Sequence, residues 1–132
     1  MSNLVLKVEE YKARILSAYT LAQQDLSKCN EDILKIGGMT GKRTRHFYNN
    51  LLDMPDARYL EVGVWQGSSF CSSLYKNSIQ WAFGVDNWSQ YEGPREKFLE
   101  NLKKFKGDTP VTFIESDFRP TGISNGRLTR KN

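Results

Sequence analysis

The chain has few of the residues that build metal centres and disulfide frameworks. Its 132 residues include only two cysteines, Cys29 and Cys71, and one histidine, His46. The cysteines lack C-x-x-C spacing and a partnering histidine cluster. We interpret them as reduced thiols of a cytoplasmic protein, with a disulfide as the lesser alternative. No late cluster of Asp, His or Asn is suited to hold a magnesium ion, so no metal site is predicted.

Long hydrophobic runs are also absent. No segment approaches the roughly 18 apolar residues that indicate a membrane span. The first seven residues lack the basic start and apolar core of a signal peptide, so we expect no membrane partner. The composition, with 39% apolar and 26% charged residues, is typical of a globular protein. A length of 132 residues allows one domain at most.

The net charge of +4 is concentrated at one end of the chain. Residues 1–118 hold fifteen acidic and fifteen basic residues, and the other four basic residues lie in 119–132. The sequence therefore defines no basic face for nucleic acid. We expect residues 119–132 to form a solvated, disordered tail, with a nucleic-acid-binding arm as the lesser alternative.

Helical signals dominate the first part of the chain. Apolar residues recur at steps of three and four over 4–26, which predicts a helix that covers a sheet or pairs with another chain. Covering a sheet is the simpler role. Asn30 is expected to cap a short helix over 30–36, and Thr44 is expected to cap a helix over 44–52. The stripe of the first helix consists of Leu4, Val8, Tyr11, Ile15, Ala18 and Ala22.

Strand and helix patterns alternate in the second part of the chain. We expect strands at 59–64, 81–85 and 111–115, and helices at 69–76 and 94–105. Such alternation predicts a parallel sheet with right-handed crossovers. The expected fold is a three-layer α/β, Rossmann-like sheet truncated to about three strands, with N-terminal helices. The expected division is a helical segment 1–56, a partial Rossmann-like cofactor-binding domain 57–118 and the basic tail 119–132.

The segment 58–70, RYLEVGVWQGSSF, is the most informative part of the sequence. A β-prone run carries Glu61 near its end and enters a loop closed by Gly63 and Gly67, after which Ser68 and Ser69 offer helix caps. A strand, a glycine turn and a helix start together present backbone N–H groups to a ligand.

An acidic residue follows at a matching place on the next strand. Asp86 lies nineteen residues after Gly67, at the end of the second apolar segment. A nucleotide-type ligand presents its ribose hydroxyls at this place in a Rossmann-like fold.

Neither phosphate-binding form of a glycine loop is present. The patterns G-x-x-x-x-G-K-[ST] and G-x-G-x-x-G are both missing. The spacing E-x-G-x-x-x-G over 61–67 instead resembles the first motif of class I methyltransferases, which bind S-adenosylmethionine. That ligand is cationic and has no phosphate, so an acid beside the turn is electrostatically favourable.

The resemblance covers residues 37–118 and implies roles for individual side chains. Asp86 would accept the ribose hydroxyls, Asp117 would lie near the adenine amino group, and Phe118 would flank the adenine ring. Glu61, Gly63 and Gly67 would form the cofactor loop. The chain resembles one subgroup of the family in its Thr-Arg-His-Phe segment before the first strand and in Gly-Val-Asp-Asn-Trp at the end of the next strand.

Each candidate also has a simpler interpretation. Gly63 and Gly67 can serve only a tight turn, and Asp86 can serve only as a helix cap or turn former. His46, next to Phe47, is more often a packed residue than a catalytic base. Trp65 and Trp88 flank the predicted pocket or belong to the core. The residues Arg43, Thr44 and Arg45 either line the pocket or are solvated.

The resemblance ends after the third strand. The later strands of the family, which usually supply acceptor contacts and catalytic groups, have no counterpart in 119–132. The expected function is therefore the S-adenosylmethionine-binding part of a class I methyltransferase with an unidentified acceptor. The alternative is a non-catalytic truncated α/β module that binds a nucleoside-like ligand or a partner protein.

The first strand is expected to keep a free edge. In the family's strand order the fourth strand pairs with that edge, and this sequence supplies no fourth strand. We expect self-association through the first-strand edge, or covering of the edge by the N-terminal helices or the tail.

Overall fold

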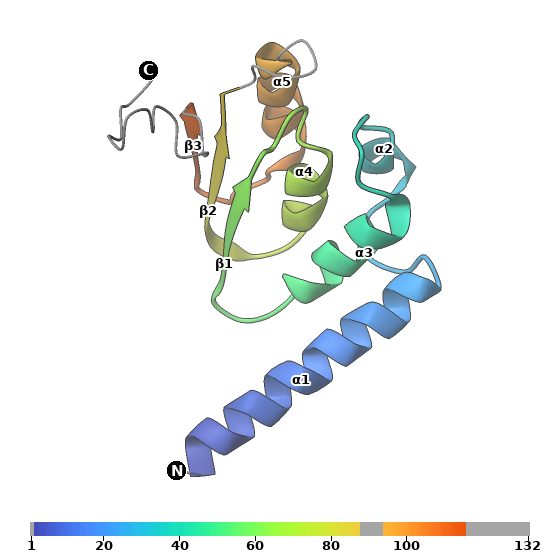
Figure 1. Ribbon diagram of the computed structural model, residues 1–132, viewed down its shortest axis with the longest axis vertical. Coiled ribbons are helices and arrows are strands. Elements are labelled where there is room, and N and C mark those ends of the chain that lie inside the picture. Colours follow the sequence, from blue (N-terminus) through green and yellow to red (C-terminus); the bar gives the residue numbers. More distant parts are fainter. Residues whose placement is uncertain (1, 88–93, 116–132) are drawn as a thin grey trace, which may run out of the picture.

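A computed structural model of the chain describes residues 2–87 and 94–115. Helices precede a region of alternating strands and helices in these residues (Figure 1). The elements are α1 (Ser2–Gln23), α2 (Glu31–Leu34), α3 (Lys42–Leu51), β1 (Ala57–Val62), α4 (Ser68–Leu74), β2 (Ile79–Asp86), α5 (Arg95–Phe105) and β3 (Val111–Glu115). The predicted alternation from the first strand to the third is confirmed.

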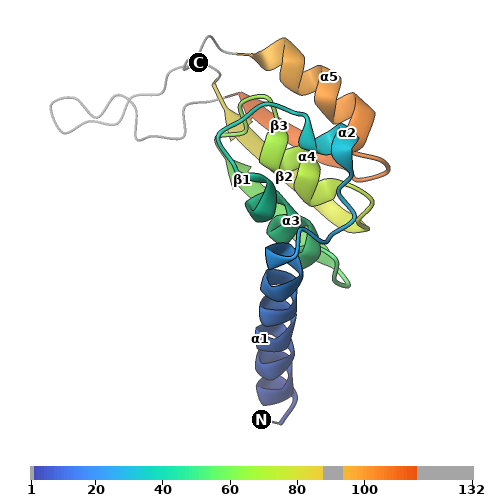
Figure 2. The same ribbon diagram turned by 90° about the vertical axis from the view of Figure 1, so that its right-hand side faces the viewer.

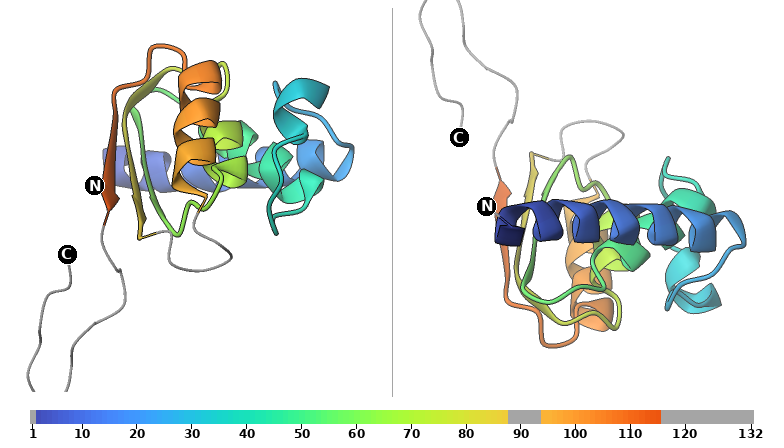
Figure 3. Two further views of the ribbon diagram at one scale, coloured as in Figure 1. Left: turned by 90° about the horizontal axis from the view of Figure 1, so that it is seen from above. Right: turned by 90° about the horizontal axis from the view of Figure 1, so that it is seen from below.

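The three strands form one parallel sheet in the order β1-β2-β3. Val62 of β1 is in register with Val85 of β2, which is in register with Ile114 of β3. Helices α4 and α5, which connect the strands, lie on the same side of the sheet (Figure 3). The predicted Rossmann-like α/β fold with a three-stranded parallel sheet and N-terminal helices is confirmed.

The main core lies between the sheet and the connecting helices. Phe70 and Leu74 of α4, Phe98 of α5 and Ala82 of β2 are completely buried there. The rings of Phe70 and Phe98 have centroids 5.9 Å apart. Burial of one such large apolar side chain contributes about 1.5–3 kcal/mol. Phe70 and Leu74 are four residues apart, so both lie on the same face of α4.

The opposite face of the sheet is exposed and apolar. Side chains from all three strands share this face, since successive residues of a strand point to opposite sides. In the part of the chain that the structure describes, the large apolar side chains on this face are 37–58% exposed. The residues are Leu60, Val62, Trp81, Phe83 and Ile114.

Helix α1 does not cover the sheet, so that expectation was wrong. Ala18 and Ala22 are buried where the C-terminal part of α1 packs on α3. Val8, Tyr11 and Ile15, on the same stripe, are 44–52% exposed. Figure 2 shows why: the N-terminal part of α1 runs away from the sheet and from the other helices.

Two of the expected caps were wrong and one is confirmed. Helix α3 begins after Gly41 rather than at Thr44, which lies within its first turn. Helix α4 begins after Gly67, so neither of the two serines that follow is its cap. Asn30 does cap α2, because its side chain accepts a hydrogen bond of 3.2 Å from the backbone N–H of Ile33.

Within residues 2–87 and 94–115, no helix combines the length and the apolar character that crossing a membrane requires.

Candidate functional site

The chain leaves β1 through a left-handed turn at the carboxyl end of the sheet. Gly63 follows β1 with φ +84°, a conformation that costs little only for glycine. Its backbone N–H donates a 2.7 Å hydrogen bond to the carbonyl of Val85, near the end of β2. The glycine turn is therefore fixed directly beside the carboxyl end of the neighbouring strand.

Asp86 and the glycine loop are in direct contact. The backbone N–H of Trp65, another residue with positive φ (+46°), donates a 2.8 Å hydrogen bond to Asp86 Oδ2. Trp65 lies in the loop that follows Gly63. The structure thus brings together two features that the sequence placed more than twenty residues apart, the glycine turn and the acid at the end of β2.

Gly67 has a packing role at the start of α4. It is buried, with φ +90°, and a Cβ there would lie 3.0 Å from Phe98 Cδ1 and 3.2 Å from Cys71 Sγ. A side chain at this position would therefore push α4 away from α5. The glycine allows the loop to enter α4 tightly against the core.

Glu61 links β1 to the first turn of α4. The hydroxyl of Tyr59 donates a 2.5 Å hydrogen bond to Glu61 Oε1, and Ser69 Oγ donates a 3.0 Å hydrogen bond to Oε2. Burial raises the pKa of Glu61 from 4.5 to about 7, although the two hydrogen bonds oppose this shift. A cation nearby would favour the ionised form of this carboxyl group.

A groove of about 800 Å³ runs along the outer edge of β1, between this strand and helices α1 and α3. Its polar lining includes Thr40, Glu61 and Ser69, beside Gly63. Most of the remaining lining is apolar: Tyr11, Ile15, Tyr48, Leu51, Leu52, Met54, Tyr59, Leu60 and Val62. The groove therefore joins the glycine turn to an apolar surface.

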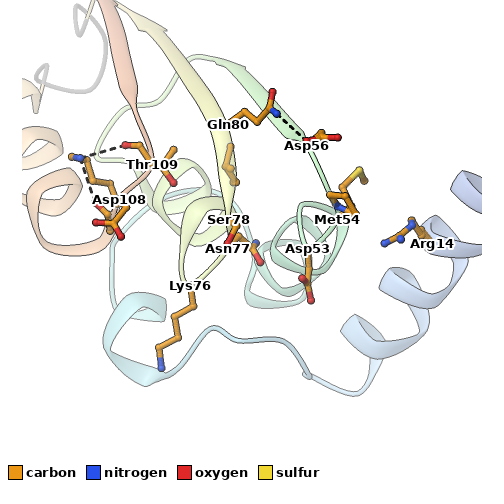
Figure 4. Close-up of a pocket in the computed structure, with 14 residues that line it drawn as sticks. Arg14, Asp53, Met54, Asp56, Lys76, Asn77, Ser78, Gln80, Asp108 and Thr109 are labelled. Carbon is orange, nitrogen blue, oxygen red and sulfur yellow. Dashed lines mark hydrogen bonds between the residues drawn. The ribbon is translucent and has the colours of Figure 1, made fainter.

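A second groove, of about 960 Å³, lies at the other end of the strands (Figure 4). Polar residues of the loops before β1, β2 and β3 line it, and several bond to one another. Gln80 Nε2 donates to Asp56 Oδ1 at 2.9 Å, and Lys106 Nζ donates to the Thr109 carbonyl at 3.3 Å. Ligands of open parallel sheets bind at the carboxyl ends of the strands. We therefore place the candidate site at the glycine turn.

The N-terminal candidates do not meet at this site. His46 is 4% exposed and its Nδ1 lies 2.6 Å from Ser27 Oγ, in a hydrogen bond. Burial lowers its pKa, so it is a neutral, packed residue. Arg43 forms a surface ion pair with Asp25 at 3.4 Å, and Thr44 is exposed.

Arg45 is buried rather than solvated, and burial lowers its pKa. Its guanidinium binds backbone carbonyls of the segment that precedes α3.

Sequence reasoning did not find Thr40, Tyr59 and Ser69 as parts of the site. A signal for Ser69 existed, because it lies directly after the glycine loop, in the first turn of the expected helix. Thr40 lies within the stretch that resembles the family but was given no role there; it reaches the groove through the loop after α2. Asp117, Phe118 and Trp88, three of the sequence candidates, lie outside the described residues.

The two cysteines are free and buried. Burial raises the pKa of Cys71 to about 12 and also raises the pKa of Cys29, so both thiols stay protonated. In the part of the chain that the structure describes, no cluster of three or more His, Cys, Asp or Glu side chains is suited to a metal ion.

Comparisons of the chain with models of protein families, with curated proteins and with solved structures found no match.

Proposed function

We propose that this chain is the S-adenosylmethionine-binding part of a class I methyltransferase, which transfers a methyl group to an acceptor of unidentified class. One observation carries the proposal. The backbone N–H groups of Gly63 and Trp65 donate hydrogen bonds to the Val85 carbonyl and to Asp86, and these bonds tie the turn after β1 to the carboxyl end of the adjacent parallel strand β2. The motif over 61–67 and the acid at the end of β2 resemble the corresponding parts of that family.

The donor and acceptor groups of the turn suit this cofactor. A carboxylate offers about four acceptor positions, so Asp86 can accept ribose hydroxyls in addition to the Trp65 N–H. Glu61 places a second acidic group beside the groove, where the cationic end of the cofactor favours its ionised form. Gly63 has no side chain to keep the ligand away from the backbone.

The cofactor supplies an electrophilic methyl group on a sulfonium. The contribution of this chain is positioning, which can supply much of the rate of a two-substrate reaction. The hydrogen bonds of Gly63 to β2 and of Trp65 to Asp86 hold the turn in one conformation before the ligand arrives. Glu61, bonded to Ser69, keeps the start of α4 in a fixed place beside that turn.

Calorimetric titration with S-adenosylmethionine and with its demethylated product, S-adenosylhomocysteine, tests the proposal. We expect a single site with a micromolar dissociation constant for both ligands. A folded chain that binds neither ligand would rule the proposal out. Transfer of a labelled methyl group to sugar, small-metabolite or macromolecular acceptors then distinguishes a transferase from the non-catalytic module that is the alternative.

A further inference from the structure

We propose that helix α1 packs on the exposed face of the sheet in a second copy of this chain, and that two copies exchange this contact symmetrically. The inference concerns an interaction surface, and it goes beyond the proposed function without depending on it. The part of the sheet that α1 would cover, called the open face below, consists of Leu60 and Val62 of β1 and Trp81 and Phe83 of β2.

The open face is apolar and exposed, although the strands that form it are parallel. All-parallel sheets occur almost only in proteins that cover both faces of the sheet. Helices α4 and α5 cover one face (Figure 3), whereas the four side chains of the open face are 37–58% exposed. Trp81 and Phe83 lie on the central strand, with ring centroids 4.8 Å apart. The open face therefore gains stability from an apolar partner.

Helix α1 has an exposed apolar stripe of its own. Four large side chains recur along it at steps of three and four residues, so they share one face of the helix. They are 44–53% exposed, whereas the alanines further along the helix are buried against α3. The members of this free stripe are Val8, Tyr11, Ile15 and Tyr19. A helix with such a stripe is suited to lie on an apolar sheet.

The free stripe does not reach the open face of its own chain. The groove of about 800 Å³ separates them, with Tyr11 and Ile15 on one wall and Leu60 and Val62 on the other. These side chains are all about half exposed, so the groove leaves both surfaces without a close partner.

The direction of α1 is fixed by its attachment to α3. Asn50 Nδ2 donates hydrogen bonds to the carbonyls of Ala18 (3.3 Å) and Leu26 (2.8 Å), at the C-terminal end of α1 and just beyond it. From this anchor the N-terminal part of the helix runs away from its own sheet (Figure 2). The free stripe is therefore available to the sheet of a second copy.

The helix and the open face match in width. A helix is about 10 Å wide and adjacent strands lie about 4.8 Å apart, so α1 covers two strands, β1 and β2, and leaves β3 outside the contact.

The exposed area is that of a stable dimer. The free stripe and the open face comprise eight side chains, each about half exposed. At roughly 200 Å² for a large side chain, they leave about 800 Å² of each copy to be buried. Because each copy supplies one helix and one sheet, the symmetric pair buries about 1,600 Å², the usual size of a specific protein interface. Such a two-fold arrangement also closes on itself.

The C-terminal residues 116–132 are a poorer cover for the open face. They contain three large apolar residues, Phe118, Ile123 and Leu128, among five charged residues. Helix α1 instead presents four large apolar side chains on one continuous face. The composition therefore favours the helix of a second copy.

Single substitutions in separate copies test the exchange. Ile15→Glu places a charge on the free stripe, and Trp81→Lys places one on the open face. The matched controls are Ser17→Glu, on the exposed opposite side of α1, and Thr112→Lys, at an exposed position of β3. Light scattering gives the mass of each protein alone and in mixtures. Thermal melts by circular dichroism verify that each variant is folded.

We expect the wild type and both controls to be dimers. Ile15→Glu and Trp81→Lys should each dimerise about a hundredfold more weakly, because an unpaired charge would be buried in both contacts. An equimolar mixture of these two variants should form dimers again. In the mixed pair one contact has wild-type residues on both sides, and the other brings the glutamate to the lysine. If Trp81→Lys does not fold, Trp81→Thr, which suits a strand, takes its place.

The other outcomes overturn the inference and indicate which surface replaces it. A wild type that stays a monomer at high concentration excludes the contact. A dimer that Ile15→Glu leaves intact would assign the association to another surface, such as the edge of β1. A dimer that Trp81→Lys leaves intact would assign it to pairing of two α1 helices. A mixture of the two variants that stays monomeric would exclude the exchange of helix and sheet.

Discussion

Asp86 Oδ2 accepts a 2.8 Å hydrogen bond from the backbone N–H of Trp65, which ties the end of β2 to the loop that follows β1. The bond gives Asp86 a role in the protein in addition to any role toward a ligand. It also means that removal of the side chain changes two things, the charge at the site and the support of the loop. Substitutions that separate these effects are therefore more informative than alanine alone.

Asp86→Asn and Asp86→Ala should weaken S-adenosylmethionine binding to different extents. Asparagine keeps an oxygen that can accept the Trp65 N–H but loses the charge that strengthens bonds to hydroxyls. We expect Asp86→Ala to weaken binding by about 1.5–3 kcal/mol and Asp86→Asn by less. Calorimetry gives both values. Unchanged affinity in a folded Asp86→Ala protein would remove Asp86 from the site.

Gly63→Ala should reduce both stability and ligand affinity. At φ +84° an alanine adds about 1–2 kcal/mol of backbone strain, and its Cβ stands where the ligand approaches the turn. Gly107→Ala is the matched control, because Gly107 also has a positive φ (+60°) and lies in the loop before β3, at the other end of the strands. A Cβ added to Gly107 would have no heavy atom within 4 Å other than those of its own residue and its chain neighbours. We expect the two variants to have similar melting temperatures, both below that of the wild type. Only Gly63→Ala should lose ligand binding. Full affinity in Gly63→Ala would contradict the site.

The raised pKa of Glu61 predicts a loss of stability as the pH rises. Between pH 4.5 and about 7 the folded state keeps a proton that the unfolded state has released. The unfolded state therefore binds fewer protons, and the free energy of unfolding falls through this window by up to about 3 kcal/mol. Glu61→Gln cannot ionise and should flatten this part of the curve. Urea denaturation of both proteins at several pH values measures the difference.

The affinity for S-adenosylmethionine should depend on pH in the opposite direction. A cationic ligand beside Glu61 binds best when this carboxyl group is ionised, so affinity should rise between about pH 5.5 and 7. Calorimetry in buffers with different ionisation enthalpies should detect release of a proton on binding at about pH 6. In Glu61→Gln both the pH dependence and the proton release should disappear. Proton release that persists in that variant would assign the titration to another group.

The strands, their alternation with helices and the acid at the end of β2 were predictable from the sequence because they depend on local patterns. Alternating apolar runs and glycine turns specify the strands. The contact between the loop after β1 and the end of β2 then follows from the parallel arrangement, which places the carboxyl ends of adjacent strands side by side.

The errors arose where distant contacts decide the structure. The stripe of α1 is one continuous pattern, yet Ala18 packs on α3 while Ile15 is exposed, and periodicity does not identify the partner. Ser69 was expected to cap α4, but its hydroxyl donates to Glu61. Arg45 was indistinguishable from its solvated neighbour Arg43, because the carbonyls that it binds lie five to eleven residues earlier in the chain.

The final prediction concerns the outer edge of β1, which pairs with no strand among the described residues. Leu60 and Val62 are 58% and 51% exposed, and α1 does not cover them, since Tyr11 and Ile15 across the groove are themselves about half exposed. An apolar edge strand of this kind favours association with a second copy. We expect light scattering to show a mass that rises with concentration. Leu60→Lys should lower it, whereas Thr112→Lys, on the same face but on β3, should not. A stable monomer with fast amide exchange along 59–64 would contradict this prediction.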